Sequence, residues 1–123
     1  MSSVLIVEDE PVLRRSLSTF LEGRGHQVAQ AATLAEARQR LGNGSFDSVF
    51  LDVYLPDGNG LDLVAEIGRR RAIVVTGRPD PAAFRERGVV HRMDKPLDLQ
   101  RAADLLESVV SRGAATPRRS DRP

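Results

Sequence analysis

Short runs of aliphatic residues alternate along this chain with segments of helical periodicity, and no other feature constrains its fold as strongly. The runs cover residues 4–7, 26–29, 49–51, 73–75 and 89–90, and the second of them is the weakest. Aliphatic runs of this length without polar alternation are typical of strands covered on both faces, as in a parallel sheet. We therefore expect five strands in one sheet.

Helical patterns fill the intervals between these runs. Pro11 stands where a first helix would begin, and the capping box Thr33-Leu34-Ala35-Glu36 predicts the start of a second. Three more helices are expected over residues 61–67, over residues 81–87 and from near Leu97 onward. Five strand–helix repeats in about 110 residues predict one doubly wound α/β domain.

We place this domain at residues 1–112 and interpret residues 113–123, rich in Gly, Ala, Pro and Arg, as a flexible basic tail or the start of a linker. Residues 1–110 carry 14 basic and 16 acidic side chains, a net charge of −2, whereas the last 13 residues carry a net charge of +3. An acidic body with only 4% aromatic residues argues against direct nucleic-acid binding by the domain.

Several other classes are excluded by what the sequence lacks. Without cysteine there is no disulfide scaffold, no thiolate metal site and no cysteine nucleophile. No Gly-Lys pair occurs, which excludes a P-loop, and no G-x-G-x-x-G follows the first strand. The first residues show no signal-peptide pattern, and the longest apolar run is far shorter than the ~20 residues of a membrane span. We expect a soluble, cytoplasmic protein without membrane contact.

Polar residues follow the predicted strands at the ends where parallel sheets bind ligands. They are Glu8, Asp9 and Glu10 after the first run, Asp52 after the third, Thr76 after the fourth, and Asp94, Lys95 and Pro96 after the fifth. Carboxylates that meet at one sheet edge repel one another unless a cation neutralises them, and hard oxygen ligands suit Mg²⁺. Taken singly, Glu10 favours a helix cap, Thr76 a turn, and Asp52 a cap or a solvated loop.

Lys95 is the only lysine in a chain with 17 arginines. An ammonium is a compact, flexible point charge, whereas a guanidinium is a planar fork. A site that binds a metal ion and a phosphate group can require the compact charge of an ammonium. The single lysine therefore supports phosphate chemistry at the end of the fifth strand.

These residues resemble the receiver domain of bacterial two-component response regulators over about residues 3–110. The resemblance rests on Val7-Glu8-Asp9-Glu10-Pro11, on the segment from Phe50 to Gly60, on Thr76-Gly77 and on Asp94-Lys95-Pro96. It implies a CheY-like, flavodoxin-like fold of five parallel strands in the order 2-1-3-4-5, with helices on both faces.

The resemblance also implies a role for each matching residue. Asp52 would accept a phosphoryl group and help to bind Mg²⁺, together with Asp9, the backbone carbonyl of Tyr54, and Glu8 acting through water. Thr76 would donate its hydroxyl to a phosphoryl oxygen, and Lys95 would pair with Asp52 or with the phosphate. Pro96 would follow a cis peptide bond that sets the loop carrying Lys95.

The chain departs from the family pattern in spacing and at the switch position. Asp52 and Thr76 are 24 residues apart, several fewer than the family usually has, which predicts a shortened segment at residues 68–71. The interval from Thr76 to Lys95 is also short, so the fourth helix should be stunted. Where the family has an aromatic switch residue, three positions before the lysine, this chain has Arg92.

Two positions flank the path of the hydrolytic water in the family, and they are Tyr54 and Arg78 here. We expect both side chains to cover the mouth of the pocket and to slow hydrolysis of the phosphorylated form. Full exposure of both side chains to solvent is the alternative.

The implied function is a signalling domain and not a conventional enzyme, with self-phosphorylation and autodephosphorylation as its only chemistry. The partners would be a sensor histidine kinase or phosphotransfer protein, a downstream protein or effector domain, and a second copy in a phosphorylation-dependent homodimer. Two alternatives stay open: a pseudo-receiver that docks partners without phosphorylation, and a Mg²⁺-dependent phosphohydrolase that uses Asp52 as nucleophile. The complete acidic site argues against the first, and a length without room for a substrate cap argues against the second.

Overall fold

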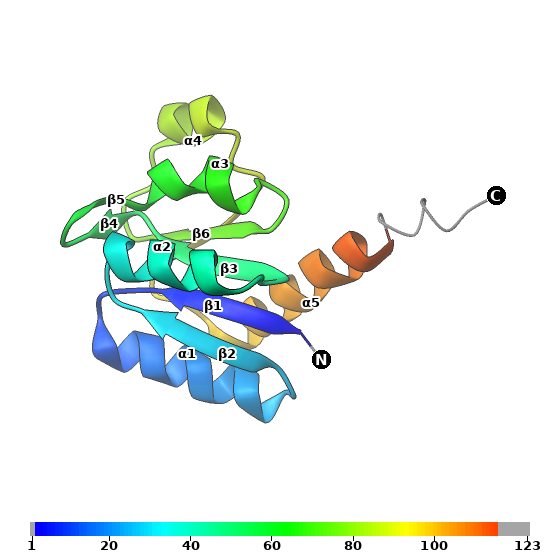
Figure 1. Ribbon diagram of the computed structural model, residues 1–123. Coiled ribbons are helices and arrows are strands. Elements are labelled where there is room, and N and C mark those ends of the chain that lie inside the picture. The colour runs from blue at the N-terminus through cyan, green and yellow to red at the C-terminus, as the bar shows by residue number, and fades with distance from the viewer. Residues whose placement is uncertain (1, 116–123) are drawn as a thin grey trace.

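Five parallel strands form the central sheet of the computed structural model, which describes residues 2–115 (Figure 1). They are β1 (Ser3–Val7), β2 (Gln27–Ala31), β3 (Ser48–Asp52), β6 (Ala72–Thr76) and β7 (His91–Asp94). Their order in the sheet is β2-β1-β3-β6-β7, and every neighbouring pair is parallel. When the five strands of this sheet are numbered in chain order, they lie in the order 2-1-3-4-5, so the predicted topology is confirmed.

Helices cover both faces of the sheet. They are α1 (Pro11–Gly23), α2 (Leu34–Asn43), the 3₁₀ turn η1 (Gly60–Leu63) that leads into α3 (Val64–Ile67), α4 (Pro81–Arg87) and α5 (Leu99–Ala115). Figure 1 shows α2, α3 and α4 on one side of the sheet and α1 and α5 on the other. No described helix combines the length and the apolar character that crossing a bilayer requires.

Alternate residues of the central strands fill two separate cores. Leu5 and Val7 of β1 pack with α2, α3 and α4, whereas Val4 and Ile6 pack with α1 and α5. This is the period of two of an extended strand, with an aliphatic side chain required at every position because both faces are covered. The uninterrupted aliphatic runs in the sequence therefore arise, as predicted, from strands that are covered on both faces.

The predicted capping box begins α2. The Thr33 side chain accepts a hydrogen bond from the Glu36 backbone N–H at 3.1 Å, while Glu36 Oε1 accepts one from the Ala32 backbone N–H at 2.8 Å. Glu10 occupies the N-cap position of α1, as expected, but its side chain makes no capping hydrogen bond.

The shortened segments lie where the spacing predicted them. Helix α3 ends at Ile67, and Gly68 turns the chain with a φ of 101° before β6 begins. Helix α4 has only seven residues and is closed by Gly88, whose φ of 73° is the left-handed conformation that glycine adopts without strain.

The fifth strand differs from its prediction. It was expected at residues 89–90, but Val89 closes the turn after α4 through a hydrogen bond from its N–H to the Phe84 carbonyl, and the strand is His91–Asp94. β7 is an edge strand whose residues alternate between partly buried and exposed, so it lacks an aliphatic run. Val90, which the prediction placed in the sheet, is 55% exposed.

The last helix begins two residues later than expected and extends past the predicted domain boundary. Asp98 caps α5 by accepting a hydrogen bond from the Arg101 backbone N–H at 3.1 Å, so the helix starts at Leu99 rather than near Leu97. It ends at Ala115, beyond residue 112. The rest of the predicted tail, residues 116–123, lies outside the described residues.

A small antiparallel hairpin was not predicted. β4 (Tyr54–Leu55) pairs with β5 (Gly58–Asn59), and Figure 1 shows this hairpin at the sheet edge where β1 ends. It begins two residues after Asp52. The hairpin therefore places Tyr54 next to the end of β3.

Candidate functional site

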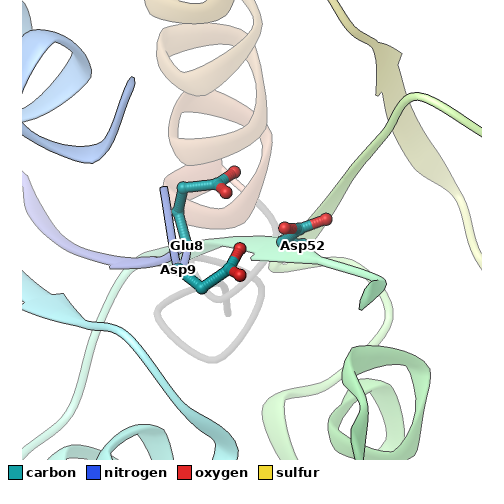
Figure 2. Close-up of side chains that lie close together, drawn as sticks. All are labelled: Glu8, Asp9 and Asp52. Carbon is teal, nitrogen blue, oxygen red and sulfur yellow. The ribbon is translucent and has the colours of Figure 1, made fainter. Parts of the chain in front are cut away.

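Three carboxylates meet at the edge formed by the ends of β1 and β3. Figure 2 shows the side chains of Glu8, Asp9 and Asp52 directed into one space. One oxygen of each lies within 4.8 Å of an oxygen of the others. Glu8 and Asp52 are each only 4% exposed, whereas Asp9 is open to solvent.

Short backbone contacts fix the loop that carries Glu8 and Asp9. The Glu8 N–H donates to the Ala31 carbonyl at 2.9 Å, which extends the pairing of β1 with β2 by one residue. The Arg14 guanidinium donates to the Glu8 carbonyl at 2.9 Å and to the Gln30 side chain at 3.1 Å. Arg14 therefore connects this loop to α1 and β2, a role that has no signal in the sequence because the residue falls within an ordinary helical pattern.

Lys95 lies between the two buried carboxylates. Its Nζ is 3.0 Å from Glu8 Oε1 and 3.4 Å from Asp52 Oδ2. The peptide bond from Lys95 to Pro96 is cis, as predicted, and the Lys95 N–H donates to the Thr76 carbonyl at 2.9 Å. The lysine is thus held against the end of β6 while its ammonium spans both acids.

Burial has the largest effect on the pKa values of the Glu8 and Asp52 carboxyl groups. It raises the pKa of Glu8 from 4.5 to about 7, against the hydrogen bond from Lys95, and it raises the pKa of Asp52 as well. Burial would lower the pKa of Lys95, but the hydrogen bond to Glu8 and the charge of Asp52 raise it overall. One ammonium does not neutralise three adjacent carboxylates, so the site favours an additional cation.

This donor set fits Mg²⁺. Mg²⁺ takes oxygen ligands, retains several waters, and is usually held by one or two carboxylates together with phosphate oxygens. Asp9 and Asp52 supply carboxylates at an open edge, and the backbone carbonyl of Tyr54 follows Asp52 by two residues. The group is therefore a candidate magnesium site.

Thr76 ends β6 beside Asp52. Asp52 is in register with Val75, so Thr76 lies one residue beyond the level of Asp52 along the neighbouring strand. Its side chain is fully buried, and its hydroxyl oxygen accepts a hydrogen bond from the Arg78 N–H at 3.0 Å. The hydroxyl proton remains available for an acceptor in the site.

Tyr54 and Arg78 contact each other across the site. The guanidinium carbon of Arg78 lies 5.9 Å from the centroid of the Tyr54 ring, within the range of a cation–π contact. Tyr54 is 51% exposed. The two side chains that were expected to cover the pocket thus form a pair, although both also face solvent.

Arg92 does not belong to the acidic group. Its guanidinium carbon lies 5.5 Å from the centroid of the Phe84 ring, so the residue at the switch position contacts α4. His26 is buried directly before β2, with Nε2 3.3 Å from Glu107 Oε2, and His91 is half-buried at the start of β7.

Comparisons with known proteins agree with this architecture. The family of response regulator receiver domains matches residues 4–107. The KDP operon transcriptional regulatory protein KdpE of Escherichia coli (strain K12) is 34% identical over 122 residues, which cover 94% of this chain and 54% of that protein. The TorCAD operon transcriptional regulatory protein TorR of the same organism is 37% identical over 103 residues, which cover 79% of this chain and 45% of that protein.

Solved structures show the same fold. The receiver domain of the TMAO respiratory system response regulator TorR superposes with a TM-score of 0.80 and 33% identity, covering 91% of this chain and 98% of that one. A CheY-like receiver domain protein from Methanospirillum hungatei JF-1 superposes with a TM-score of 0.86, 24% identity and coverage of 94% and 98%. The chain spans about half the length of the curated relatives it matches. The match across residues 4–107 and the identity to these relatives establish that the chain belongs to the receiver domains of two-component response regulators, the family of phosphoryl acceptors.

Proposed function

We propose that Asp52 is the phosphoryl acceptor of this receiver domain and that it takes the group from a sensor histidine kinase or a phosphotransfer protein. The observation that carries this proposal is the convergence of Glu8, Asp9 and Asp52 at one sheet edge, with Lys95 between the two buried acids. In the transfer, an Asp52 oxygen attacks the phosphorus in line with the donor atom, and the bond from phosphorus to the donor breaks. Such a transfer depends chiefly on positioning and on charge neutralisation.

The residues around Asp52 supply both the positioning and the charge neutralisation. Asp52 Oδ1 accepts a weak hydrogen bond from the Tyr54 N–H at 3.4 Å, which restricts rotation of the carboxylate. Lys95 can follow the negative charge from Asp52 to the phosphoryl oxygens because it is already within 3.4 Å of Oδ2. The Thr76 hydroxyl can donate its proton to a phosphoryl oxygen.

The proposed Mg²⁺ ligands are Asp9, Asp52 and the backbone carbonyl of Tyr54. Glu8 is proposed to contact the ion through a water molecule. When bound, Mg²⁺ offsets the negative charges of the carboxylates and of the incoming phosphoryl group. Ionisation of Glu8 is then less costly, since its raised pKa arises from burial next to another acid.

The proposed output is a conformational signal to a protein partner, to an effector domain or to a second copy of the chain. The relatives KdpE and TorR are named as transcriptional regulatory proteins, and this chain matches about half of their length. We propose that the receiver itself does not contact nucleic acid and that it acts in the cytoplasm as a signalling domain. The proposed basic tail or linker start follows α5, which ends at Ala115.

Phosphorylation by a small donor tests the assignment. Acetyl phosphate with Mg²⁺ should add one phosphoryl group to the wild-type chain, which mass spectrometry detects, and EDTA should abolish the modification. Asp52→Asn should remain unmodified, whereas the control Asp62→Asn, at an exposed carboxylate that pairs with Arg87, should react like the wild type. A phosphoryl group that persists in Asp52→Asn would refute the assignment. A wild-type chain that reacts neither with acetyl phosphate nor with histidine kinases would favour the docking module instead.

A further inference from the structure

We propose that Asp57 is a positioning residue for the Mg²⁺ site, because it fastens the hairpin that carries Tyr54 to the first turn of α2. The inference rests on the proposed function, in which the Tyr54 carbonyl is a Mg²⁺ ligand. Asp57 itself lies in the turn between β4 and β5 and would not touch the ion.

Both carboxylate oxygens of Asp57 bind the backbone of α2. Oδ1 accepts a hydrogen bond from the Leu34 N–H at 2.8 Å, and Oδ2 accepts one from the Ala35 N–H at 3.1 Å. A carboxylate at a helix N-terminus also interacts favourably with the helix dipole. These hydrogen bonds, first that from Leu34, hold the pKa of Asp57 below its usual range. The Asp57 carboxylate that joins the hairpin to α2 is therefore ionised at neutral pH.

Helix α2 has a second cap, which is local. The Thr33 side chain accepts from the Glu36 N–H, so Thr33 and Asp57 divide the first three N–H groups of the helix between them. Thr33 belongs to the chain that leads into α2, whereas Asp57 comes from another segment. Loss of Thr33 would weaken the helix alone, but loss of Asp57 would also release the hairpin.

The tip of the hairpin packs closely against the same helix. Gly58 has a φ of 152°, which strains a residue with a side chain, and a Cβ atom there would lie 2.6 Å from Leu34 Cδ1, so the leucine would have to move. Leu55 is 9% exposed and belongs to the same apolar core as Leu34. Backbone hydrogen bonds to Asp57 and apolar packing of Leu55 thus hold one end of the hairpin on α2.

The base of the hairpin is held at the acceptor. The Gly60 N–H donates to the Val53 carbonyl at 2.7 Å, and Tyr54 pairs with Asn59 across the two strands. Tyr54 therefore lies between an anchor at β3 and an anchor at α2. Its carbonyl keeps a constant place relative to Asp52 only while both anchors hold.

Mg²⁺ binding tests the inference without measuring phosphorylation. Tyr54 is the only tyrosine and the chain has no tryptophan, so intrinsic tyrosine fluorescence reports on this hairpin alone. Mg²⁺ titrations by calorimetry and by fluorescence would compare the wild type with Asp57→Ala, Asp57→Asn and the control Thr33→Ala. Circular dichroism would verify that each variant is folded.

We expect Asp57→Ala to weaken Mg²⁺ binding about tenfold, a typical loss when a residue that orients a metal ligand is removed. Asp57→Asn should lie between this variant and the wild type, because an amide oxygen can still accept one of the two hydrogen bonds. Thr33→Ala should bind Mg²⁺ within about twofold of the wild type, since the hairpin keeps its tether. The Tyr54 emission should change in Asp57→Ala before Mg²⁺ is added.

Two results would overturn the positioning role of Asp57. One is equal Mg²⁺ affinity in wild type and Asp57→Ala; the other is an equal loss in Thr33→Ala, which would trace the effect to helix stability. If Asp57→Ala does not fold, the same comparison between Asp57→Asn and Thr33→Ala decides the question. A wild-type chain that binds no Mg²⁺ in calorimetry would instead refute the proposed metal site, and this inference with it.

Discussion

The guanidinium carbon of Arg78 lies over the ring of Tyr54, 5.9 Å from the ring centroid, within the range of a cation–π contact. Tyr54 follows Asp52 by two residues, and Arg78 follows Thr76 by two, so the pair joins the loops after β3 and β6. Each loop also makes a backbone hydrogen bond to its site residue, from Tyr54 to Asp52 and from Arg78 to Thr76. The contact therefore bridges the two strand ends between which a phosphoryl group would lie.

Opening this pair should shorten the lifetime of the phosphorylated form. Neither a phenol nor a guanidinium is suited to act as a general base for water, so the effect of both side chains should be to exclude water. We expect Tyr54→Asn/Arg78→Ala to release phosphate roughly tenfold faster, which corresponds to about 1.4 kcal/mol of barrier. Phosphate release at equal Mg²⁺ measures this, with Arg70→Ala as a control at an exposed position. Equal half-lives in the double variant and the wild type would contradict the shielding.

Arg92 should carry the signal from the site to α4 in place of an aromatic residue. Its cation–π contact with Phe84 links β7 to α4, and a change of charge at Asp52, which Lys95 contacts three residues further along the chain, can alter that contact. Beryllofluoride with Mg²⁺ should shift the amide resonances of α4 in the wild type, and these shifts should shrink in Arg92→Ala. Arg101→Ala, at an exposed arginine of α5, provides the control. If the α4 resonances move identically in Arg92→Ala and wild type, Arg92 has no part in the switch.

Glu8 should make the Mg²⁺-free domain less stable as the pH rises. Its pKa is about 7 in the folded chain and 4.5 as the ordinary value, so between these values the folded state binds more protons than the unfolded state. The free energy of unfolding therefore falls from about pH 5 to about pH 7.5, and the raised pKa of Asp52 acts in the same direction. Urea unfolding in EDTA measures the trend.

Two controls isolate the contribution of Glu8 to this trend. Glu8→Gln cannot ionise and should flatten the profile. Excess Mg²⁺ should reverse the trend, because the ion favours the ionised carboxylates. A free energy of unfolding that rises through this window in EDTA would contradict the assignment of the raised pKa to Glu8.

Gly60 should not tolerate a side chain. A Cβ atom there would lie 1.9 Å from the backbone oxygen of Asp52, and neither atom belongs to a flexible group. We expect Gly60→Ala to lower the free energy of unfolding by about 1–3 kcal/mol and to impair phosphorylation of Asp52. Gly42, in α2, has no atom within 4 Å of such a Cβ, so Gly42→Ala should raise the free energy of unfolding by about 0.5–1 kcal/mol. Denaturation of both variants is the measurement, and similar effects of the two substitutions would contradict the steric argument.

The features that the sequence alone determined are those with a local signal. The aliphatic runs of β1, β3 and β6 are continuous because these strands are covered on both faces, so the strands themselves could be predicted, whereas their order in the sheet was implied by the family resemblance. The site residues could be expected in one place because the carboxyl ends of parallel strands share one edge of the sheet. They are Glu8, Asp9, Asp52, Thr76 and Lys95. The end of α3 and the short α4 followed from glycine positions and spacing. β7 was misplaced because an edge strand needs aliphatic residues on one face only.

Only the tertiary structure decided which side chains meet across segments. Asp57 binds the backbone of Leu34 and Ala35, and two cation–π contacts join Arg78 to Tyr54 and Arg92 to Phe84. Each contact depends on the angle at which a loop leaves the sheet and on the reach of a long or polar side chain. Backbone propensity and hydrophobic period contain no information on either quantity, because both are set by the packing of elements that are distant in the chain. Residue types therefore predicted the acidic site, whereas the packing of the loops decided what orients it.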